Sequence, residues 1–388
     1  MTDSRGAAGG LKANAVDVLP EGALAEQLGR GAPLRVKWGI DPTAPDIHFG
    51  HAVLLNKLRE FQDEGHTVVL IIGDFTARVG DPSGRSAQRP LLTAEEIEAN
   101  ARTFQEQAFK LLDRGATEVR FNSEWLRMDA EELFGLLSRA TVARLLERDD
   151  FRRRMEAQAP ISALELLYPV LQGYDSVEVR ADVELGGTDQ KFNLLFARDV
   201  QASYGQQPQS VMTMPILPGT DGVQRMSKSL GNYVGVTDPP EEMFGKLMRI
   251  PDEAMEQYYA LLLSEEVPPG APNETKRALA RRLVVRFYDE GAAAGAEEHF
   301  DRLHVRGELP VEIEEARGTA NGPVHLPALL AEQFGISRSE ARRLIGQGGV
   351  KIDGEVVGDD QLDVPADALD GAVVQVGKRR HKRVRIAP

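Results

Sequence analysis

To about residue 220, the chain alternates short apolar, β-branched runs with longer segments in which apolar residues recur at helical spacing. The apolar runs are nearly continuous, as in strands that are buried on both faces of a sheet. They span 34–40, 67–76 and 209–217. The helical segments span 51–65, 93–113 and 161–175. This alternation predicts a doubly wound parallel sheet, which binds its ligands at the carboxyl ends of the strands.

The strand pattern stops at residues 237–240 (TDPP). Helical spacing follows, then a Gly/Pro/Glu-rich stretch, and finally two short helices and two β-branched runs. The sequence therefore predicts an α/β fold: a doubly wound parallel-sheet (Rossmann-like) domain, a helical domain and a small α+β domain. The predicted bounds are 1–33 for an N-terminal segment, 34–236 for the sheet domain, 237–305 for the helical domain, 306–324 for a linker and 325–388 for the small domain.

Composition narrows the class of protein. The apolar share of 42% and the charged share of 27% over 388 residues are those of an ordinary globular protein. The chain has no cysteine, which excludes disulfides, thiolate nucleophiles and cysteine-based zinc sites. It shows neither a long apolar run nor the apolar core of a signal peptide, so we expect a cytoplasmic protein without a membrane partner.

The net charge of −14 argues against a nucleic-acid partner for the chain as a whole, but basic residues gather near its end. Two basic runs, 338–343 (RSEARR) and 378–385 (KRRHKRVR), fall in the small domain. A local basic patch attracts a phosphate backbone whatever the total charge. One such run alone indicates a solvated face, whereas two in one small module favour RNA binding. The candidate RNA-binding residues are Arg338, Arg342, Arg343, Lys351, Lys378, Arg379 and Arg380.

Two histidines three residues apart, His48 and His51, stand where the first strand leads into a helix. A helix N-terminus offers free N–H groups and the positive end of a dipole, both of which suit phosphate. Gly50 removes a side chain at this turn, and the two imidazoles add short, rigid donors. The pattern favours an anion site. The alternative is that the histidines only cap and pack the helix.

A polar segment far downstream, residues 223–232 (VQRMSKSLGN), carries Lys228 between two serines. A mobile loop with a lysine can close over a triphosphate and release it later. Alone, this segment indicates only a solvated loop. Together with the two histidines, at the other end of a series of strand–helix units, it indicates a nucleotide site.

A third pattern lies on the helix predicted at 161–175. Tyr168, Gln172 and Asp175 stand at i, i+4 and i+7, so their side chains share one face. Such a face forms hydrogen bonds, and Pro169 within it favours a binding site over neutral packing. Asp175 suits a phenolic hydroxyl, and Tyr168 and Gln172 suit an ammonium group. The alternative is an exposed polar face.

Two Gly-rich turns complete the set of candidates. Asp81, in GDPSGR (80–85), follows an apolar strand and by itself indicates only a turn. In GGTDQ (186–190), the glycines let a ligand approach the backbone closely. Asp189 suits ribose hydroxyls, and Gln190 suits a carbonyl oxygen that develops charge.

The segments 39–51 (GIDPTAPDIHFGH) and 225–229 (RMSKS) together resemble the two signatures of the class I aminoacyl-tRNA synthetases. With the two Gly-rich turns and the Tyr–Gln–Asp face, the chain resembles the bacterial tyrosyl-tRNA synthetases over nearly its whole length. Its tail is similar to their small RNA-binding domain of the ribosomal-protein-S4-like type. The resemblance implies ATP-dependent activation of L-tyrosine to tyrosyl-adenylate plus pyrophosphate, and transfer of tyrosine to the 3'-terminal ribose of tRNA(Tyr).

The resemblance also implies roles for individual residues, which act by alignment and charge stabilisation and not as nucleophiles. The expected catalytic residues are Thr43, His48, His51, Arg225 and Lys228. The expected ATP-binding residues are His48, Gly50, His51, Arg85, Gly187, Asp189, Met226, Ser227 and Lys228. The expected tyrosine-binding residues are Lys37, Gly39, Asp41, Asp81, Tyr168, Gln172, Asp175 and Gln190.

Three residues depart from the family pattern. Lys37 stands where many members have a tyrosine that helps to bind the substrate hydroxyl. Recognition of this hydroxyl therefore rests mainly on Asp175 or uses Lys37 in a different way. Arg225 stands where lysine is frequent, and Lys191 replaces an aromatic residue. These changes indicate a variant subfamily.

The expected partners are L-tyrosine, ATP and tRNA(Tyr), and the family implies a symmetric homodimer. Mg²⁺ is expected with ATP, without a metal site built by the protein. The alternatives are a tryptophanyl-tRNA synthetase-like enzyme, a small nucleotidyltransferase and a synthetase-derived RNA-binding protein. The small nucleotidyltransferase would lack the lysine loop and the tail, and the tryptophan enzyme would lack the tail and Asp175. A non-enzyme would tolerate loss of His48, His51 or Lys228, and all three are present.

Overall fold

The structure is a computed structural model that describes residues 9–81, 92–306, 313–319, 322–377 and 380–387. The chain divides into two compact units, Met1–Glu297 and Glu298–Pro388, which are treated one at a time below. Three predicted site residues lie outside the described residues: Arg85, Lys378 and Arg379. Within the described ranges, no helix is both long enough and apolar enough to span a membrane.

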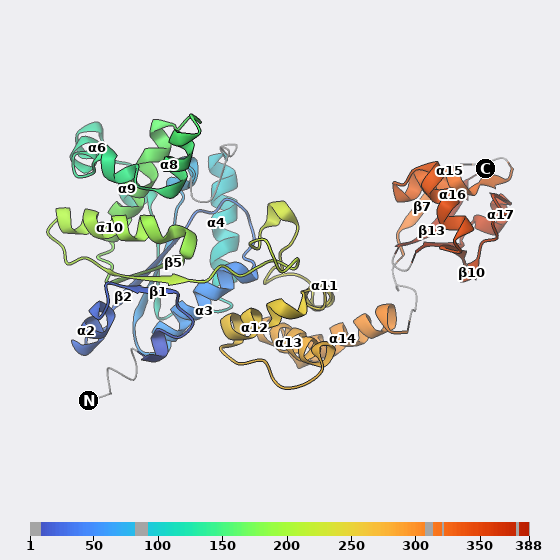
Figure 1. Ribbon diagram of the computed structural model, residues 1–388, viewed down its shortest axis with the longest axis horizontal. Coiled ribbons are helices and arrows are strands. Elements are labelled where there is room, and N and C mark those ends of the chain that lie inside the picture. The colour runs from blue at the N-terminus through green and yellow to red at the C-terminus, as the bar shows by residue number, and fades with distance from the viewer. Residues whose placement is uncertain (1–8, 82–91, 307–312, 320–321, 378–379, 388) are drawn as a thin grey trace. The chain divides into compact units, whose positions relative to one another are not determined.

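The first unit is built on a six-stranded sheet with the order β1-β6-β5-β2-β3-β4 (Figure 1). Strands β2 to β6 all run parallel to one another, whereas β1 at the edge runs antiparallel to its neighbour β6. The predicted doubly wound parallel sheet is therefore confirmed. The strands are β1 (Asp17–Leu19), β2 (Arg35–Ile40), β3 (Thr67–Ile72), β4 (Thr117–Phe121), β5 (Val183–Gly187) and β6 (Ser210–Met214).

Helices cover both faces of this sheet, which explains why its strands are apolar almost throughout. Figure 1 shows α3 (Phe49–Asp63) on one face and both α9 (Ala163–Glu178) and α10 (Lys191–Ser203) on the other. In β3, every residue from Val68 to Ile72 is fully buried. The predicted helix after β3 is α4 (Ala94–Ala108), which begins with Thr93 and Glu96 exchanging hydrogen bonds in a capping box.

Two regions of this unit were not predicted. The segment 1–33, expected to precede the sheet domain, instead contributes β1 and α2 (Ala23–Gly29), and β1 covers the β6 edge of the sheet. Short helices fill the chain between β4 and α9, each with too few turns for a clear periodicity. They are α5 (Ser123–Leu126), α6 (Ala130–Leu137), α7 (Val142–Leu145) and α8 (Asp149–Glu156).

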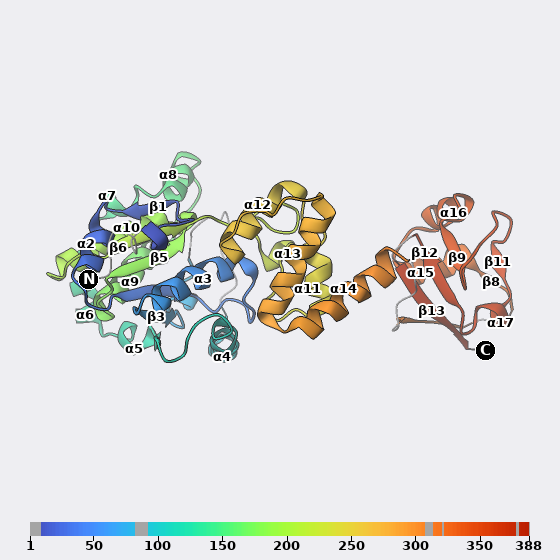
Figure 2. The ribbon, with the colours of Figure 1, turned by 90° about the horizontal axis from the view of Figure 1, so that it is seen from below.

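Helices follow β6, as predicted, and they belong to the same compact unit as the sheet up to Glu297 (Figure 2). Their core includes Tyr258 and Tyr259, which are fully buried. The Tyr258 hydroxyl donates to the Pro218 carbonyl at 2.9 Å and so ties the helices to the loop after β6. The helices are α11 (Pro240–Leu247), α12 (Met255–Tyr258), α13 (Pro272–Phe287) and α14 (Glu290–His304), with a π-helical turn at Tyr259–Leu263.

The second unit has a five-stranded sheet, β10-β9-β12-β13-β7, and a two-stranded sheet, β11-β8. β7 lies within the stretch 306–324 that was expected to be a linker; it pairs in parallel with β13 and buries Ala316 in the core. The strands are β7 (Glu315–Thr319), β8 (Val324–His325), β9 (Val350–Ile352), β10 (Glu355–Val356), β11 (Asp363–Val364), β12 (Val373–Val376) and β13 (Arg380–Ala387). The helices are α15 (Leu326–Phe334), α16 (Arg338–Gly346) and α17 (Ala366–Leu369).

Candidate active site

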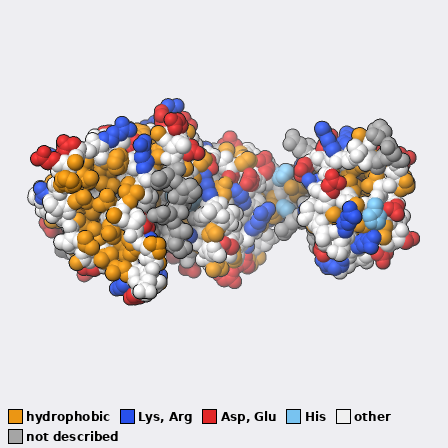
Figure 3. Space-filling view, turned by 90° about the horizontal axis from the view of Figure 1, so that it is seen from above, with side chains coloured by type: hydrophobic (Ala, Val, Ile, Leu, Met, Phe, Trp, Pro, Cys, Tyr) orange, Lys and Arg blue, Asp and Glu red, His pale blue; other side chains and the backbone are white. Residues whose placement is uncertain are grey.

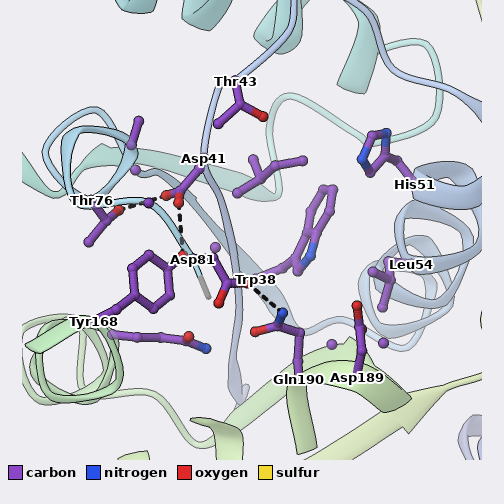
Figure 4. Close-up of a pocket in the computed structure, with 18 of the residues that line it drawn as sticks. Trp38, Asp41, Thr43, His51, Leu54, Thr76, Asp81, Tyr168, Asp189 and Gln190 are labelled. Carbon is purple, nitrogen blue, oxygen red and sulfur yellow. Dashed lines mark hydrogen bonds between the residues drawn. The ribbon is translucent and has the colours of Figure 1, made fainter. Parts of the chain in front are cut away.

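A cavity of about 810 Å³ opens at the carboxyl ends of the parallel strands (Figure 4). It lies where the strand order reverses: β2 leads through α3 to β3 on one side, and β5 leads through α10 to β6 on the other. Ligands of doubly wound sheets bind at such a switch point. The cavity brings together most of the predicted site residues, namely Gly39, Asp41, Thr43, His48, Gly50, His51, Asp81, Tyr168, Gln172, Asp175, Gly187, Asp189, Gln190, Arg225, Met226, Ser227 and Lys228.

The two histidines cap α3 and also line the cavity, so the two interpretations of this pair are compatible. His48 Nδ1 accepts from the backbone N–H of Gly50 at 3.1 Å, and His51 Nδ1 accepts from the backbone N–H of His48 at 3.3 Å. The rings stack with their centroids 3.9 Å apart. Because each Nδ1 is an acceptor, each neutral ring carries its proton on Nε2.

Both histidines are neutral at pH 7. Burial lowers the pKa of His48 to about 4, with a further contribution from the positive charge of Lys228. Burial also places the pKa of His51 well below its usual value, and His48 and Lys228 lower it further. Each ring therefore offers one N–H donor to a ligand, without a positive charge of its own.

Gly50 is required by the position of the His48 ring. A Cβ at residue 50 would lie 2.9 Å from His48 Cε1 and 3.0 Å from Nδ1. Alanine normally stabilises a helix relative to glycine by about 0.8–1 kcal/mol, but here it would displace the imidazole. We expect Gly50→Ala to lower kcat for the adenylate formation that the resemblance implies by about tenfold, with the melting temperature nearly unchanged.

A matched control for this prediction is Gly245→Ala in α11, where a new Cβ meets no atom within 4 Å. Pre-steady-state measurement of adenylate formation and thermal unfolding by circular dichroism would compare the two variants. Full activity of Gly50→Ala would show that the position of the His48 ring does not limit the reaction.

Asp41, which follows β2, is the centre of a buried hydrogen-bond chain. It accepts from the Tyr168 hydroxyl at 2.8 Å and from the Thr76 hydroxyl at 2.7 Å (Figure 4). The Asn122 amide donates to the same Thr76 hydroxyl at 2.9 Å. Gly73 is needed here, since a Cβ would lie 2.1 Å from Asp41 Oδ1. Burial raises the pKa of Asp41 to about 7.

Asp175, the last residue of the Tyr–Gln–Asp face of α9, is a buried acceptor at the cavity wall. It accepts from the indole N–H of Trp125 at 2.8 Å and from the Asn122 amide at 3.4 Å. Burial raises the pKa of Asp175 to about 6, so the carboxylate is mostly ionised at pH 7. α9 continues through Pro169, and the Tyr–Gln–Asp face predicted for it lines the cavity.

Two further carboxylates of the cavity, Asp81 and Asp189, also have polar partners. Asp81 accepts from the Gln190 amide at 2.8 Å (Figure 4). Asp189 lies 3.6 Å from the guanidinium of Arg225, and burial raises its pKa. Gln190 follows β5 and Asp81 follows β3, so the hydrogen bond between them joins the chain beyond two of the parallel strands.

The segment 223–232 lies against the cavity, with Lys228 at the start of a single 3₁₀ turn (Lys228–Leu230). The Lys228 ammonium forms an ion pair with Asp46, a carboxylate from the first signature segment. Asn232 organises the loop by accepting from the Ser227 N–H at 2.8 Å and donating to Asp221 at 2.8 Å. A carboxylate therefore neutralises the loop lysine in this structure, where a phosphate group would be an alternative partner.

Lys37 differs from the expectation that it contacts tyrosine. Its side chain is fully buried within β2 and is not part of the cavity wall. Its ammonium group pairs with Glu184 on β5 at 2.8 Å. The reason is the direction of its side chain, which turns towards α9: the ammonium also donates to the Ser176 hydroxyl at 2.7 Å and to the Gln172 carbonyl at 3.0 Å.

Several residues of the site were not predicted from the sequence. Thr76, Asn122 and Trp125 complete the hydrogen-bond chain, Glu184 lines the cavity, and Asp46 pairs with Lys228. Thr76 and Asn122 follow the carboxyl ends of β3 and β4, so their place in the strand pattern was an available signal. The pairing of Asp46 carries no sequence signal, because its partner lies far along the chain.

The predicted RNA-binding residues of the second unit lie on three elements. Arg338, Arg342 and Arg343 are exposed on α16, Lys351 is on β9 and Arg380 begins β13. Part of the final basic run is paired internally: Lys382 meets Glu314 at 3.0 Å, and Arg385 meets Glu315 at 3.5 Å. On α16, Arg343 is likewise paired, with Glu340 at 2.5 Å, so both elements have part of their charge neutralised within the unit.

The chain has a nucleotide-sized cavity at the switch point of a parallel sheet. Its H-x-G-H segment caps a helix at this cavity, and a loop with a lysine lies against the same cavity. These features together define a class I aminoacyl-tRNA synthetase. A family model described as tRNA synthetases class I (W and Y) matches residues 30–304, and the S4 domain model matches residues 326–366. The chain belongs to this class I tRNA synthetase family and ends in an S4 domain.

Curated relatives match nearly the whole chain. A tyrosine–tRNA ligase of Syntrophotalea carbinolica is 50% identical over 396 residues, covering 97% of this chain and 96% of the relative. One of Thermotoga maritima is 50% identical over 394 residues, covering 96% of each. One of Coxiella burnetii is 48% identical over 400 residues and covers both chains fully, at 100%.

Solved structures share the fold of about three quarters of the chain. Tyrosyl-tRNA synthetase of Archaeoglobus fulgidus, solved as a complex with L-tyrosine, superposes with a TM-score of 0.62 at 22% identity. The match covers 76% of this chain and 99% of that one. A truncated mitochondrial enzyme of Aspergillus nidulans gives a TM-score of 0.62 at 20% identity, covering 78% and 94%.

Proposed function

We propose that the chain activates L-tyrosine with ATP to give tyrosyl-adenylate and pyrophosphate, and transfers the tyrosyl group to the 3'-terminal ribose of tRNA(Tyr). Family membership and about half identity to tyrosine–tRNA ligases over almost the whole length support this function. The observation that carries the choice of amino acid is Asp175. It is a buried carboxylate, held by Trp125 and Asn122, at the wall of a cavity that also contains the two signature segments.

In the first step, a carboxylate oxygen of tyrosine attacks the α-phosphorus of ATP. A new P–O bond forms, the bond to the bridging oxygen breaks, and pyrophosphate leaves with that electron pair. In the second step, a ribose hydroxyl of the tRNA attacks the tyrosyl carbonyl, and AMP leaves. No side chain becomes covalently bound, so catalysis consists of alignment and of charge stabilisation.

The cavity residues suit this chemistry. The Nε2–H of His48 and the hydroxyl of Thr43 are donors for the phosphate that is being transferred, and His51 is placed for the ribose region. Lys228 and Arg225 are the positive charges for pyrophosphate, and each is paired with a carboxylate in this structure. ATP binding would exchange these carboxylates for phosphate oxygens.

The tyrosine subsite suits both ends of the amino acid. Asp175 accepts from the phenolic hydroxyl, and Asp81, Tyr168 and Gln172 surround the ammonium group. Gln190, whose amide donates to Asp81 at 2.8 Å, is the proposed partner of the carbonyl oxygen. A cavity that is built to accept a hydroxyl leaves its buried acceptor unpaired when phenylalanine binds, which penalises the wrong substrate.

Amino-acid-dependent ATP–pyrophosphate exchange tests this function. Exchange with tyrosine, and none above background with phenylalanine or tryptophan, is the expected result. Exchange with tryptophan instead of tyrosine would favour the tryptophanyl-tRNA synthetase-like alternative. Absence of exchange with all twenty amino acids would favour an RNA-binding protein derived from a synthetase.

We propose that residues 34–236 form the catalytic domain, that the helices of 237–305 contact the anticodon side of the tRNA, and that 325–388 bind RNA. Arg338 and Arg342 support the last role. Both are exposed on α16, and neither forms an ion pair with another described residue. We keep 306–324 as the connecting segment, although β7 packs with the second unit.

Removal of residues 307–388 is expected to leave tyrosine-dependent exchange within about twofold of the full chain. It should lower kcat/KM for tRNA charging by about 10²-fold, because a second binding module raises the effective concentration of the tRNA. Cutting after Arg306 keeps α14 whole and removes β7 together with its partner β13. Steady-state charging and exchange would be measured on the same preparation.

Arg338→Ala combined with Arg342→Ala in the full chain is the matched control, since it keeps the fold of the second unit and removes only the two charges. It should weaken charging and make it less sensitive to salt. Equal loss of exchange and charging in the truncated chain would show that the second unit is part of the catalytic fold.

ATP is the nucleotide substrate of this class, and we propose that Mg²⁺ arrives on its phosphates, held mainly by substrate and water. Among the residues that the structure describes, no group of three or more His, Cys, Asp or Glu side chains is placed to hold a metal. We also propose a cytoplasmic location, where charged tRNA is used.

A symmetric homodimer is the proposed assembly. The helices between β4 and α9 expose apolar side chains to solvent: Phe134 is 68% exposed, Val142 60% and Met155 53%. Figure 3 shows hydrophobic side chains gathered on a face of the first unit. Large exposed apolar patches are typical of protein–protein contacts, and a two-fold axis would let one patch cover its own copy.

A further inference from the structure

A lysine is buried in the middle of the central parallel sheet. Lys37 on β2 is 0% exposed, and its partner Glu184 on β5 is 1% exposed. The two residues are direct neighbours in the parallel register of β2 and β5. The other residues of these strands are largely apolar, so a charged pair here needs a specific reason.

All three N–H donors of the Lys37 ammonium are used. They reach Glu184 at 2.8 Å, the Ser176 hydroxyl at 2.7 Å and the Gln172 carbonyl at 3.0 Å. Glu184 in turn accepts from the Gln172 amide at 3.1 Å, from the Ser176 hydroxyl at 3.2 Å and from Gln209. The pair therefore ties α9 to the sheet at two positions, Gln172 and Ser176.

These two positions flank Asp175, the proposed acceptor of the substrate hydroxyl. Asp175, Gln172 and Glu184 line the cavity, whereas Lys37 lies behind them. Lys37 therefore does not touch a ligand and acts only through residues that do. Without the pair, α9 would lose the buried polar contacts that fix its rotation and height against β5.

We propose that Lys37 and Glu184 form a positioning pair that sets selectivity for tyrosine, by fixing α9 against the sheet and by balancing charge behind Asp175. This inference rests on the proposed function, because it assumes that Asp175 accepts the phenolic hydroxyl. It assigns Lys37 a role as a positioning residue and adds Glu184 to the specificity-determining residues of the chain.

The electrostatic part of this role has two opposing contributions. The positive charge of Lys37 lowers the pKa of Asp175, and the negative charge of Glu184 raises it, in addition to the larger effect of burial. Other groups also act on this part of the cavity: the charges of Asp41 and Asp81 and the dipoles or hydroxyls of Tyr168, Trp125, Asn122 and Thr76. Because these remain unchanged in variants at 37 or 184, the two substitutions isolate the pair.

The test uses Lys37→Met and Glu184→Gln in the full-length chain. The pH profile of kcat/KM for tyrosine is measured by pyrophosphate exchange, and its acidic limb is the range in which kcat/KM falls as the pH is lowered. In Lys37→Met the midpoint of this limb should shift to higher pH by about one unit, because Asp175 loses a nearby cation. In Glu184→Gln the midpoint of the acidic limb should shift to lower pH, because Asp175 loses a nearby anion. KM for tyrosine should rise about tenfold in Lys37→Met, with KM for ATP unchanged.

Arg35→Met is the matched control. Arg35 is on the same strand and pairs with Glu118 at 2.8 Å, but both side chains are 34% exposed and neither lines the cavity. This variant should leave the pH profile and KM for tyrosine unchanged. A variant with both Lys37→Met and Glu184→Leu removes both charges, so its acidic limb should return towards that of the wild type.

Shifts of opposite sign in the two single variants would support the proposal. Shifts of the same sign, or no shift with only a lower melting temperature, would overturn it, since a purely structural pair does not move a pH profile. If Lys37→Met does not fold, Glu184→Gln decides alone: a downward shift supports the pair and an unchanged limb overturns it. Absence of tyrosine exchange in the wild type would instead overturn the proposed function.

Discussion

Lys228→Ala is expected to lower the rate constant for tyrosyl-adenylate formation by about 10²–10³-fold, the usual effect of removing one donor that acts in the transition state. Negative charge builds on pyrophosphate as its bond to the α-phosphorus breaks. Lys228 is the cation whose charge acts on both histidines, and they are neutral because burial lowers their pKa values. Neutral histidines cannot supply the charge that the lysine provides.

Stopped-flow measurement of adenylate formation would give this rate constant, and equilibrium dialysis would give the dissociation constant of tyrosine. The tyrosine constant should stay within about twofold, because the Lys228 ammonium pairs with Asp46, which is not among the residues of the proposed tyrosine subsite. Lys191→Ala is the matched control: it breaks an ion pair with Asp17 at 2.7 Å and does not line the cavity. A rate within a few-fold of wild type would assign the charge stabilisation to Arg225 instead.

Asp175→Asn should have the largest effect on substrate choice. We expect the ratio of kcat/KM for tyrosine to that for phenylalanine to fall by about 10–100-fold, because a hydrogen bond to a charged group is worth about 1.5–3 kcal/mol. The same substitution should stabilise the ligand-free protein at pH 8. Wild-type Asp175 carries a buried charge there, with its pKa raised to about 6 from 3.8.

The direction in which stability changes with pH follows from proton binding at Asp175. Between pH 4 and 6 the folded state binds more protons at Asp175 than the unfolded state does, so stability falls as pH rises through this range. Asparagine avoids this loss, which is on the order of 2–3 kcal/mol above pH 6. The gain should vanish at pH 4, where the wild-type carboxyl is protonated in the folded state.

Urea unfolding at pH 4 and pH 8, together with exchange assays on both amino acids, would measure the two effects. Asp199→Asn is the control, since Asp199 is 56% exposed and its substitution should change the free energy of unfolding by less than about 0.5 kcal/mol. An unchanged preference for tyrosine would show that another group recognises the phenolic hydroxyl.

Much of the site was predictable because its residues follow strand ends or share a helix face. The histidine pair, the lysine loop, Asp189 and the Tyr–Gln–Asp face are local patterns, and the fold brings them to one cavity. The roles of Asp41, Thr43 and Asp81 came from the resemblance of short segments. Thr76 and Asn122 follow strand ends, but nothing in the sequence connects them, or Trp125, with Asp41 and Asp175, because these contacts join residues far apart in the chain.

The sequence by itself determined the strand–helix alternation, the class of sheet, the two signature segments and the polar face of α9. It could do so because these features repeat at spacings that backbone geometry imposes. Only the tertiary structure decided that Lys37 is buried against Glu184, that Asp46 pairs with Lys228 and that both histidines are neutral. Charge pairing and desolvation depend on distances between residues far apart in the chain, and a linear pattern carries no such distances.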